Sequence, residues 1–496
     1  MSIQTDRLVT AMDVVVCGAG PVGLMLSCEL ALADISVVVL EKRLENSVVP
    51  RANGIVGQPV RLLELRGLLA GFSAGRYAGP VPSYPFGDVL MDLSLIPDVR
   101  LPALLIPQPE LERLLADRAV ELGATIRRGH EVTAFSQSAD RVTVQVRQDD
   151  DSYELSPRYL VGCDGGHSVV RQQAGIAFPG SADPEVLRMG HFRAPEAAGL
   201  YTNAGLDVPG FGRLQRGWNR TPRGAVLAMS LQPGVVIAGV REPGEAPRDK
   251  ASLTLPELQA SARRVLGGEL PLGEPIWLSQ VVVQGRLAQR YRDGRVFLAG
   301  DAAHLFPAGG ALTVGLPDAV NLGWKLAAAL IDRADLLDTY EAERRPIAKR
   351  ALLQTRAQAA LTQAAGDNGV ALRELLGELL TYAGPLRHLV ALMDGSDRRF
   401  DTIPGGHPLT GRFVPALPLK SFLRNGKPIL LDLADRPAVR AIADGWPVEV
   451  VIRPYDARPT AALLVRPDGY VAWAGDERDL DGLHAAVARW CLPYPP

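Results

Sequence analysis

The chain has 496 residues, of which 47% are hydrophobic and 22% charged, and its 53 Lys and Arg against 55 Asp and Glu give a formal charge of -2. This length exceeds one ordinary core, so we expect two or three domains, and the composition excludes disordered and fibrous classes. A balanced charge without long runs of one sign argues against a nucleic-acid partner.

The N-terminal segment MSIQTDRLVTAMD has no apolar run of signal-peptide length, and no stretch reaches the roughly 20 apolar residues that a membrane helix needs. We therefore expect a cytoplasmic protein without a membrane partner. The cysteines lack the close pairing of a zinc site, so no metal is predicted and they are expected to be reduced and structural: Cys17, Cys28, Cys163 and Cys491.

The first elements form a βαβ unit. Residues 12–17 are a β-branched apolar run bounded by glycine, which predicts a strand buried on both faces. A helix over 22–33 and a second strand over 36–40 follow. A glycine-rich turn therefore lies between a buried strand and a helix.

That turn reads Gly18-Ala-Gly20-Pro-Val-Gly23. Gly18 permits the tight turn, Gly20 lets the backbone approach a pyrophosphate, and Gly23 lets the helix pack closely on the strand. The acidic Glu41 ends the second strand, where it can accept hydrogen bonds from a ribose. The pattern predicts a dinucleotide site formed by Gly18, Gly20, Pro21, Val22, Gly23, Glu41, Lys42 and Arg43.

The middle of the chain alternates between strand and helix patterns. A Pro- and Gly-rich stretch over 71–107 is expected to be irregular and to contribute to the substrate side, and a helix is expected over 109–122. Residues 125–163 predict a small meander that returns to a buried strand. Residues 176–284 read as a separate sheet-rich domain.

A buried strand over 295–299 precedes helices over 316–333 and 335–363, the second with Glu341, Glu343 and Arg344 on its solvent side. Residues from 395 onward begin with a linker and end in an appendage, with a strand at 448–452, a strand pair at 461–473 and a helix at 479–491. The sequence thus predicts an α/β fold whose domains span 1–175 with 285–394, then 176–284, then 395–496.

Further motifs carry a family resemblance. The stretch from Tyr159 to Arg171, which contains Asp164-Gly165, and the stretch from Gly294 to His304, which contains Gly300-Asp301, resemble the Asp-Gly and Gly-Asp motifs of class A flavoprotein aromatic hydroxylases. Residues 318–326 resemble the helix that follows the second motif. RPDGYVAW at 466–473 resembles the thioredoxin-like appendage of the phenol and polyketide hydroxylase branch.

The resemblance implies a discontinuous Rossmann-type FAD domain, a mixed β-sheet substrate domain and a small thioredoxin-like C-terminal domain. Asp301, at the carboxyl end of a strand, can hold the ribityl chain. The Pro307-Ala-Gly-Gly310 turn precedes a helix whose first N–H groups can face the flavin pyrimidine. The implied flavin contacts at this end are Asp301, Pro307, Gly309, Gly310, Ala311 and Leu312.

Single residues also match the family. Arg51 corresponds to an arginine near the pyrophosphate and the nicotinamide donor, Gln108 to a glutamine at the ribityl region, and Asp164 to a group that holds the flavin. The alternative for Arg51 is a solvated loop residue and for Gln108 a helix cap. Arg51 and Pro307 would position the reactants, without acting as an acid or base.

The histidines of the two motifs, His167 and His304, are interpreted as structural. One departure from the family is a shorter loop around Thr313, where relatives usually carry an asparagine. The turn beneath the flavin pyrimidine is therefore expected to differ in detail from that of the family.

The implied reaction reduces FAD with NADPH or NADH, adds O₂ to give a C4a-hydroperoxide, and transfers one oxygen to a polycyclic, polyketide-like aromatic product or an antibiotic such as a rifamycin. Aromatic residues of the sheet-rich domain are candidate substrate walls: Phe192, Tyr201, Phe211 and Trp218. The C-terminal domain lacks a Cys-x-x-Cys pair, so a structural or interface role is expected.

Competing functions share this scaffold. Halogenation is disfavoured because the Trp-x-Trp-x-Ile-Pro signature is absent. Baeyer-Villiger oxygenation remains open, as does a non-catalytic FAD-binding scaffold protein. The chain is expected to be a monomer or a homodimer.

Overall fold

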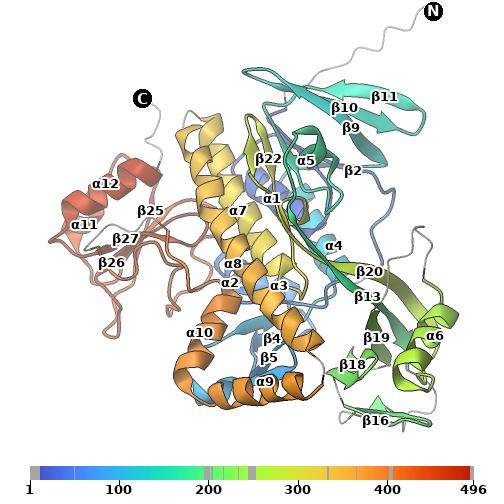
Figure 1. The fold of residues 1–496 in the computed structure, drawn as a ribbon. Coiled ribbons are helices and arrows are strands. Elements are labelled where there is room, and N and C mark those ends of the chain that lie inside the picture. Colours follow the sequence, from blue (N-terminus) through green and yellow to red (C-terminus); the bar gives the residue numbers. More distant parts are fainter. Residues whose placement is uncertain are drawn as a thin grey trace, which may run out of the picture.

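The computed structural model describes residues 12–49, 51–194, 201–202, 205–215, 217–232, 234–243, 253–331, 334–364, 366–400 and 406–491. Two long helices, α7 (Ala311–Leu330) and α8 (Asp338–Gln363), run through its middle. Figure 1 shows the C-terminal domain on one side of these helices and a large antiparallel sheet on the other. The α/β fold class predicted from the sequence is confirmed.

The first sheet is parallel except at one edge and has the order β21-β22-β12-β1-β2-β8. Its strands are β21 (Arg292–Asp293), β22 (Val296–Leu298), β12 (Tyr159–Gly162), β1 (Val14–Cys17), β2 (Val37–Glu41) and β8 (Thr125–Arg128). The apolar runs at β1, β2 and β12 are buried along their whole length, as their β-branched composition predicts. Segments distant in sequence therefore form one continuous sheet.

Helices and a meander cover this sheet. Helix α1 (Pro21–Leu32) contacts both α4 (Gln108–Glu121) and α7, and the short α5 (Val169–Gln173) contacts β12. The predicted meander comprises β9 (His130–Gln137), β10 (Val142–Gln148) and β11 (Asp151–Leu155). The four cysteines are free, and three of them are buried while Cys163 is partly exposed.

The antiparallel sheet, called the substrate sheet below, has the order β17-β18-β19-β13-β20-β23. Its strands are β17 (Gly217–Thr221), β18 (Gly224–Gln232), β19 (Val235–Pro243), β13 (Gly180–Arg193), β20 (Pro275–Leu287) and β23 (His304–Leu305), and β14 (Tyr201–Thr202), β15 (Gly205–Val208) and β16 (Gly212–Leu214) form a small sheet beside it. Helix α6 (Leu255–Leu266) packs on one face of the substrate sheet. The long strands β13 and β20 carry the chain into and out of this domain.

The stretch over 71–107 is more regular than expected. It forms short elements together with the residues before it: β3 (Ile55–Val56), α2 (Gln58–Leu65), α3 (Leu69–Phe72), β4 (Ala78–Pro80), β5 (Ser83–Phe86), β6 (Val89–Asp92), η1 (Leu93–Leu95) and β7 (Pro102–Leu104). Proline lacks an N–H, so it confines such strands to short pieces and edges. Such short, Pro- and Gly-rich strands show no alternating apolar pattern, so the pairing of β3, β7 and β4 could not be predicted from the sequence.

The helical segment before the C-terminal domain is longer than predicted. After η3 (Gly300–Ala302), α7 begins at Ala311, before the expected residue 316, and η4 (Ala334–Leu337) connects it to α8. Helices α9 (Gly366–Leu379) and α10 (Ala383–Asp394) follow. The predicted solvent side of α8 is wrong for Glu343 and Arg344, which are only 6% and 1% exposed.

The C-terminal domain has a four-stranded sheet of order β25-β24-β26-β27. Its elements are β24 (Ile429–Asp432), α11 (Pro437–Ala441), β25 (Glu449–Ile452), β26 (Ala462–Val465), β27 (Val471–Gly475) and α12 (Leu480–Trp490). A βαβ unit with parallel strands is followed by an antiparallel strand pair and a helix. This is the arrangement of a thioredoxin-like domain.

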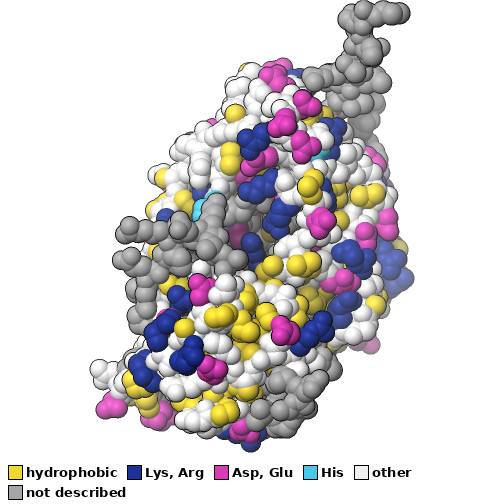
Figure 2. All heavy atoms as spheres, turned by 90° about the vertical axis from the view of Figure 1, so that its right-hand side faces the viewer, with side chains coloured by type: hydrophobic (Ala, Val, Ile, Leu, Met, Phe, Trp, Pro, Cys, Tyr) yellow, Lys and Arg dark blue, Asp and Glu magenta, His cyan; other side chains and the backbone are white. Residues whose placement is uncertain are grey.

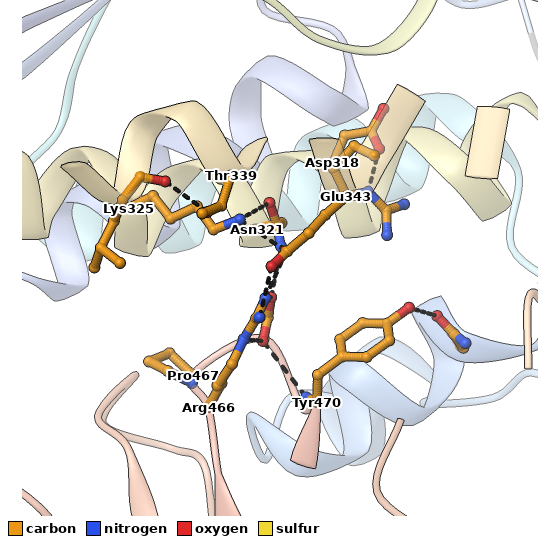
Figure 3. Close-up of polar contacts among 12 residues, drawn as sticks. Asp318, Asn321, Lys325, Thr339, Glu343, Arg466, Pro467 and Tyr470 are labelled. Carbon is orange, nitrogen blue, oxygen red and sulfur yellow. Dashed lines mark hydrogen bonds and ion pairs between the residues drawn. The ribbon is translucent and has the colours of Figure 1, made fainter. Parts of the chain in front are cut away.

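The turn between β26 and β27 inserts into the rest of the protein (Figure 3). Arg466 donates to both carboxylate oxygens of Glu343 on α8 at 2.7 Å, and Asp468 accepts from Asn321 on α7 at 2.6 Å. Lys325 donates to Glu343 at 2.7 Å. We call these five side chains the ion cluster: Asn321, Lys325, Glu343, Arg466 and Asp468. Their contacts explain why the polar face of α8 is buried.

Candidate functional site

A cavity of about 1120 Å³ opens at the carboxyl ends of the central parallel strands. This is where ligands bind to open α/β sheets. Typical small-molecule sites measure roughly 300–1,000 Å³, so this cavity has room for more than one ligand. It runs from the first strand–helix turn past the start of α7 to Met229 on the substrate sheet.

The glycine-rich turn forms one wall of the cavity. Gly18 has φ +105°, and a Cβ there would lie 2.4 Å from the carbonyl oxygen of Cys163, so only glycine fits. A Cβ on Gly23 would lie 2.1 Å from the Gly18 oxygen, which places Gly23 in strand–helix packing and off the cavity wall. Gly20, Pro21 and Val22 line the cavity, and nothing lies within 4 Å of a Cβ on Gly20.

The start of α1 is suited to an anion. Its N-cap is Gly20, no side chain caps it, and its first turn holds no acidic residue. The unpaired N–H groups of the first turn and the positive end of the helix dipole therefore face the open space above Gly20. A pyrophosphate would fit there.

Glu41 is fixed in place before any ligand binds. Its Oε2 accepts from the N–H of Ala19 and its Oε1 from the N–H of Arg43, both at 2.9 Å. The carboxylate is buried, yet the residue lines the cavity beside Lys42 and Arg43. Each carboxylate oxygen keeps acceptor capacity that two ribose hydroxyls can use.

The start of α7, like that of α1, is suited to negative charge. Gly310 is its N-cap with φ +85°, and no side chain caps the helix. Ala311, Leu312 and Thr313 follow at the cavity wall, so their unpaired N–H groups lie in the first turn beside it. The hydroxyl of Thr313, the residue at which the sequence resemblance departs from the family, lies 3.5 Å from the Val56 oxygen.

Asp301 and Arg51 also line the cavity. Asp301 is exposed at the cavity wall, and desolvation by the surrounding protein raises the pKa of its carboxyl, while the nearby charges of His304 and Arg51 oppose the rise. His304 Nε2 lies 2.7 Å from Asp318 Oδ2, and both side chains are fully buried. Asp318 also accepts from Arg344 at 2.6 Å, so the expected structural role of His304 agrees with its contacts.

The Asp-Gly motif contributes a polar group with spare capacity. Asp164 accepts from the N–H of Val170 at 3.2 Å through Oδ2, while its buried Oδ1 has no partner among the described residues. Burial raises the pKa of this carboxyl. An unpaired buried acceptor at a cavity wall fits a ligand that donates a hydrogen bond.

Gln108 lies at the start of α4 and donates to Glu112 at 2.8 Å, which leaves its amide oxygen for the cavity. His167, Gly309 and Gly310 also reach the cavity wall, whereas Pro307 lies in the loop just before it. The predicted cofactor residues thus surround one cavity, with Gly23 and Pro307 shaping it from outside. Together the open turn, the two uncapped helices and the unpaired Asp164 oxygen fit FAD.

Three of the aromatic residues predicted as substrate walls, Phe192, Phe211 and Trp218, do not line this cavity. Phe192 is fully buried against α6, because alternate residues of a strand face opposite sides and its neighbour His191 shares the face of Met229. Phe211 lies in a surface turn between β15 and β16. Trp218, on an edge strand, faces the Arg241 guanidinium at 5.1 Å, and the side chain of Tyr201 lies outside the described residues.

Several lining residues were not predicted from the sequence. They are Tyr84 and Pro85 on β5, Met229 on β18, Gln354 and Gln358 on α8, and Met393 on α10. The spacing of Gln354 and Gln358, one helical turn apart, is a signal that the sequence contains. No group of three or more His, Cys, Asp or Glu suited to a metal, and no helix suited to crossing a membrane, occurs in the described part of the chain.

Comparisons with known proteins agree with this geometry. Residues 11–355 match the family model of an FAD binding domain, and residues 407–493 match that of the aromatic-ring hydroxylase C-terminal domain. The chain belongs to the FAD-binding aromatic-ring hydroxylase family. It is an FAD-dependent monooxygenase, as the sequence resemblance predicted.

Particular relatives cover almost the whole chain. A 12-dehydrotetracycline 5-monooxygenase/anhydrotetracycline 6-monooxygenase of Streptomyces rimosus is 41% identical over 97% of this chain and 99% of its own length. A rifampicin monooxygenase of Streptomyces venezuelae is 36% identical over 94% and 96%. A dialkyldecalin synthase of Streptomyces rugosporus is 36% identical over 97% and 99%.

A solved structure, the OxyS anhydrotetracycline hydroxylase from Streptomyces rimosus, superposes with a TM-score of 0.86 at 39% identity. It covers 98% of this chain and 99% of its own. The similarity therefore includes the substrate sheet and the C-terminal domain as well as the FAD domain.

Proposed function

We propose that the protein hydroxylates a polycyclic, polyketide-like aromatic natural product or antibiotic, consuming NAD(P)H and O₂. The observation that supports this most is the single cavity that joins the cofactor residues to the substrate sheet. Bound FAD supplies the acceptor for the hydride of NAD(P)H and the site of reaction with O₂. The names of the relatives support a fused-ring substrate.

Each group of cavity residues would hold a different part of the FAD molecule. Val22 and its neighbours at the start of α1 hold the pyrophosphate, Glu41 holds the ribose, and Asp301 with Gln108 holds the ribityl chain. The first N–H groups of α7 stabilise negative charge on the flavin pyrimidine. Arg51 lies at the cavity wall and positions the reductant, while Pro307 fixes the loop.

The experiment is turnover of the FAD-loaded enzyme with NADPH, isotopically heavy O₂ and hydroxylated anthraquinones. We expect substrate-dependent NADPH oxidation and a product that carries one heavy oxygen as a new hydroxyl group. A lactone or ester product would indicate Baeyer-Villiger oxygenation. Binding of FAD without oxygen transfer to any substrate would contradict the proposal. This outcome has to be tested, because one relative, the dialkyldecalin synthase, is not named as a monooxygenase.

We also propose the domain division predicted from the sequence, a cytoplasmic location, and a monomeric or homodimeric state. The sheets support the division, because β13 and β20 are the strands that connect the FAD domain to the substrate sheet. Sedimentation of the holoenzyme would test the oligomeric state.

A further inference from the structure

The cavity extends along one face of α8, beyond the flavin end. A Cβ on Gly310 would lie 3.8 Å from Cγ2 of Thr355, so α8 passes beside the loop that precedes α7. Ala351, Gln354 and Gln358 line the cavity from the same helical face. We name the part lined by residues 81–105, Met229, α8 and Met393 the α8 end.

The α8 end differs in charge from the rest of the cavity. Every lining residue that these segments contribute is uncharged, and most are apolar: Val81, Pro85, Leu105, Met229, Ala351 and Met393. The cofactor part, by contrast, carries Lys42, Arg43 and Arg51. Figure 2 shows hydrophobic side chains gathered in the middle of the lower half of this face, with charged side chains around them.

This neutrality restricts the ligand. A carboxylate or ammonium group that entered the α8 end would lose its hydration without gaining an ion partner. Uncharged aromatic surface would instead replace water against apolar walls, which is favourable. The α8 end therefore selects against ionic aromatic compounds.

The polar groups of the α8 end are neutral hydrogen-bonding groups with spare capacity. Gln354 is 7% exposed, and its amide has no partner among the described residues. Gln358 accepts from the N–H of Gly87 at 3.3 Å through its oxygen, which leaves its NH₂ group for the cavity. Burial raises the pKa of Tyr84, so its hydroxyl stays protonated and can donate.

We infer that Gln354 and Gln358 are specificity-determining residues that bind carbonyl or hydroxyl oxygens along one edge of an uncharged, fused-ring substrate. Their Cβ atoms, one turn apart, are separated by about 5–6 Å, which suits oxygens on adjacent rings. Thr355 contributes no hydrogen to this edge, because its hydroxyl donates to Ala351 of its own helix at 2.8 Å. The inference names the substrate class of the proposed function and rests on it.

The test measures binding rather than turnover. The FAD-loaded protein is titrated with 1,8-dihydroxyanthraquinone, which is neutral, and with anthraquinone-2-carboxylate, and the flavin difference spectrum reports each Kd. We expect wild type to bind the neutral compound at least tenfold more tightly. Gln354→Leu should weaken that binding about three- to tenfold, the effect of one neutral hydrogen bond, while Gln354→Lys should reverse the preference.

Gln148→Leu is the matched control, because Gln148 is exposed on β10, where it pairs with His130 of the cofactor part and does not itself line the cavity. Gln354 has no hydrogen-bond partner to lose within the described segments, so Gln354→Leu should fold like wild type, and flavin content and thermal midpoint check this. Equal Kd values for the two anthraquinones, no spectral change with either, or unchanged binding in Gln354→Leu would overturn the inference. Selective binding without oxygen transfer would contradict only the proposed function, whereas oxygen transfer without selectivity would contradict only the inference.

Discussion

At the scale of single residues, the cofactor site is prepared by hydrogen bonds that exist without the cofactor. Ala19 and Arg43 each donate a backbone N–H to the Glu41 carboxylate. The side chain is thereby held in one orientation, so little conformational entropy remains to be lost when a ribose binds. Glu41 is where a single change should affect FAD most directly.

Glu41→Gln is expected to weaken FAD binding about tenfold to a hundredfold, the range for loss of charge-assisted hydrogen bonds. A glutamine would also turn its NH₂ group toward one of two N–H donors, where it cannot accept. The measurement is the FAD Kd by quenching of flavin fluorescence on addition to the apoprotein. Glu45→Gln, at an exposed position nearby, is the control and should bind FAD like wild type; equal Kd values for both variants would refute the role of Glu41.

Sequence patterns predict those cofactor-site residues for which the backbone geometry or the charge permits only one residue type. Gly18, Gly20 and Glu41 follow from spacing alone, since the turn, the approach of phosphate and the acid each need a particular residue type. Substrate contacts are different. Strand alternation places Phe192 and His191 on opposite faces of the substrate sheet, but the pattern does not say which face packs against α6 and which meets the cavity.

At the scale of elements, the start and the middle of α7 have separate roles. Its first turn faces the cavity, while Asn321 and Lys325 belong to the ion cluster and Asp318 binds Arg344. Arg344 also donates to the Val314 oxygen at 3.2 Å, near the first turn. The contacts of the C-terminal domain and the geometry at the flavin end are therefore linked through one helix.

Arg466→Met is expected to destabilise the holoenzyme by about 3–5 kcal/mol, the cost of removing one partner from a buried ion pair. The side chains of Arg466, Glu343 and Asp468 are nearly inaccessible to solvent, so water cannot replace the lost guanidinium. Denaturant unfolding followed by tryptophan fluorescence measures the change. Arg478→Met removes an exposed arginine of the same domain and should leave the midpoint unchanged; similar losses in both variants would argue against the cluster.

The ion cluster also predicts a dependence on pH. Burial opposes ionisation of Glu343, but Arg466 and Lys325 outweigh it and hold its pKa well below the usual range. A depressed folded pKa stabilises the protein above the unfolded value of about 4.3 and loses this effect as the pH falls further. The difference in unfolding free energy between wild type and Glu343→Gln should therefore shrink from about pH 6 to pH 3.

Glu374→Gln, at an exposed position of α9, is the control for this titration and should differ from wild type equally at every pH. A gap for Glu343→Gln that stays constant with pH would contradict the assigned pKa shift.

The elements were predictable where one pattern dominates. The parallel strands are continuous apolar runs, and RPDGYVAW marks the last hairpin. The buried side of α8 was not predictable, because Glu343 looks like a solvent-facing acid until Arg466 is placed beside it from 123 positions further along the chain. Local patterns do not contain such pairings.

At the scale of the whole molecule, one hydrophobic core is shared by two domains. Buried residues of the parallel sheet, such as Val15 and Leu160, and of the C-terminal domain, such as Leu431 and Val465, belong to one contiguous cluster. The FAD domain and the C-terminal domain should therefore not unfold independently.

Calorimetry of the holoenzyme is expected to show these two domains melting in one transition. The substrate sheet has a core of its own with α6, so it can melt in a separate transition. Hydrogen exchange followed by mass spectrometry assigns each transition to its segments. Loss of protection in residues 429–475 at a lower temperature than in residues 14–41 would contradict a shared core.

The position of the ion cluster in the chain has a consequence for biosynthesis. Lys325 and Glu343 leave the ribosome well before Arg466 and Asp468 are translated, so α7 and α8 first meet water with their cluster side unpaired. Multidomain chains fold largely in the order of synthesis, and incompletely packed intermediates expose aggregation-prone surface. A chain truncated before the last hairpin should therefore be incompletely folded and bound by chaperones or degraded by proteases. It should not be an active flavoprotein that merely lacks its final domain.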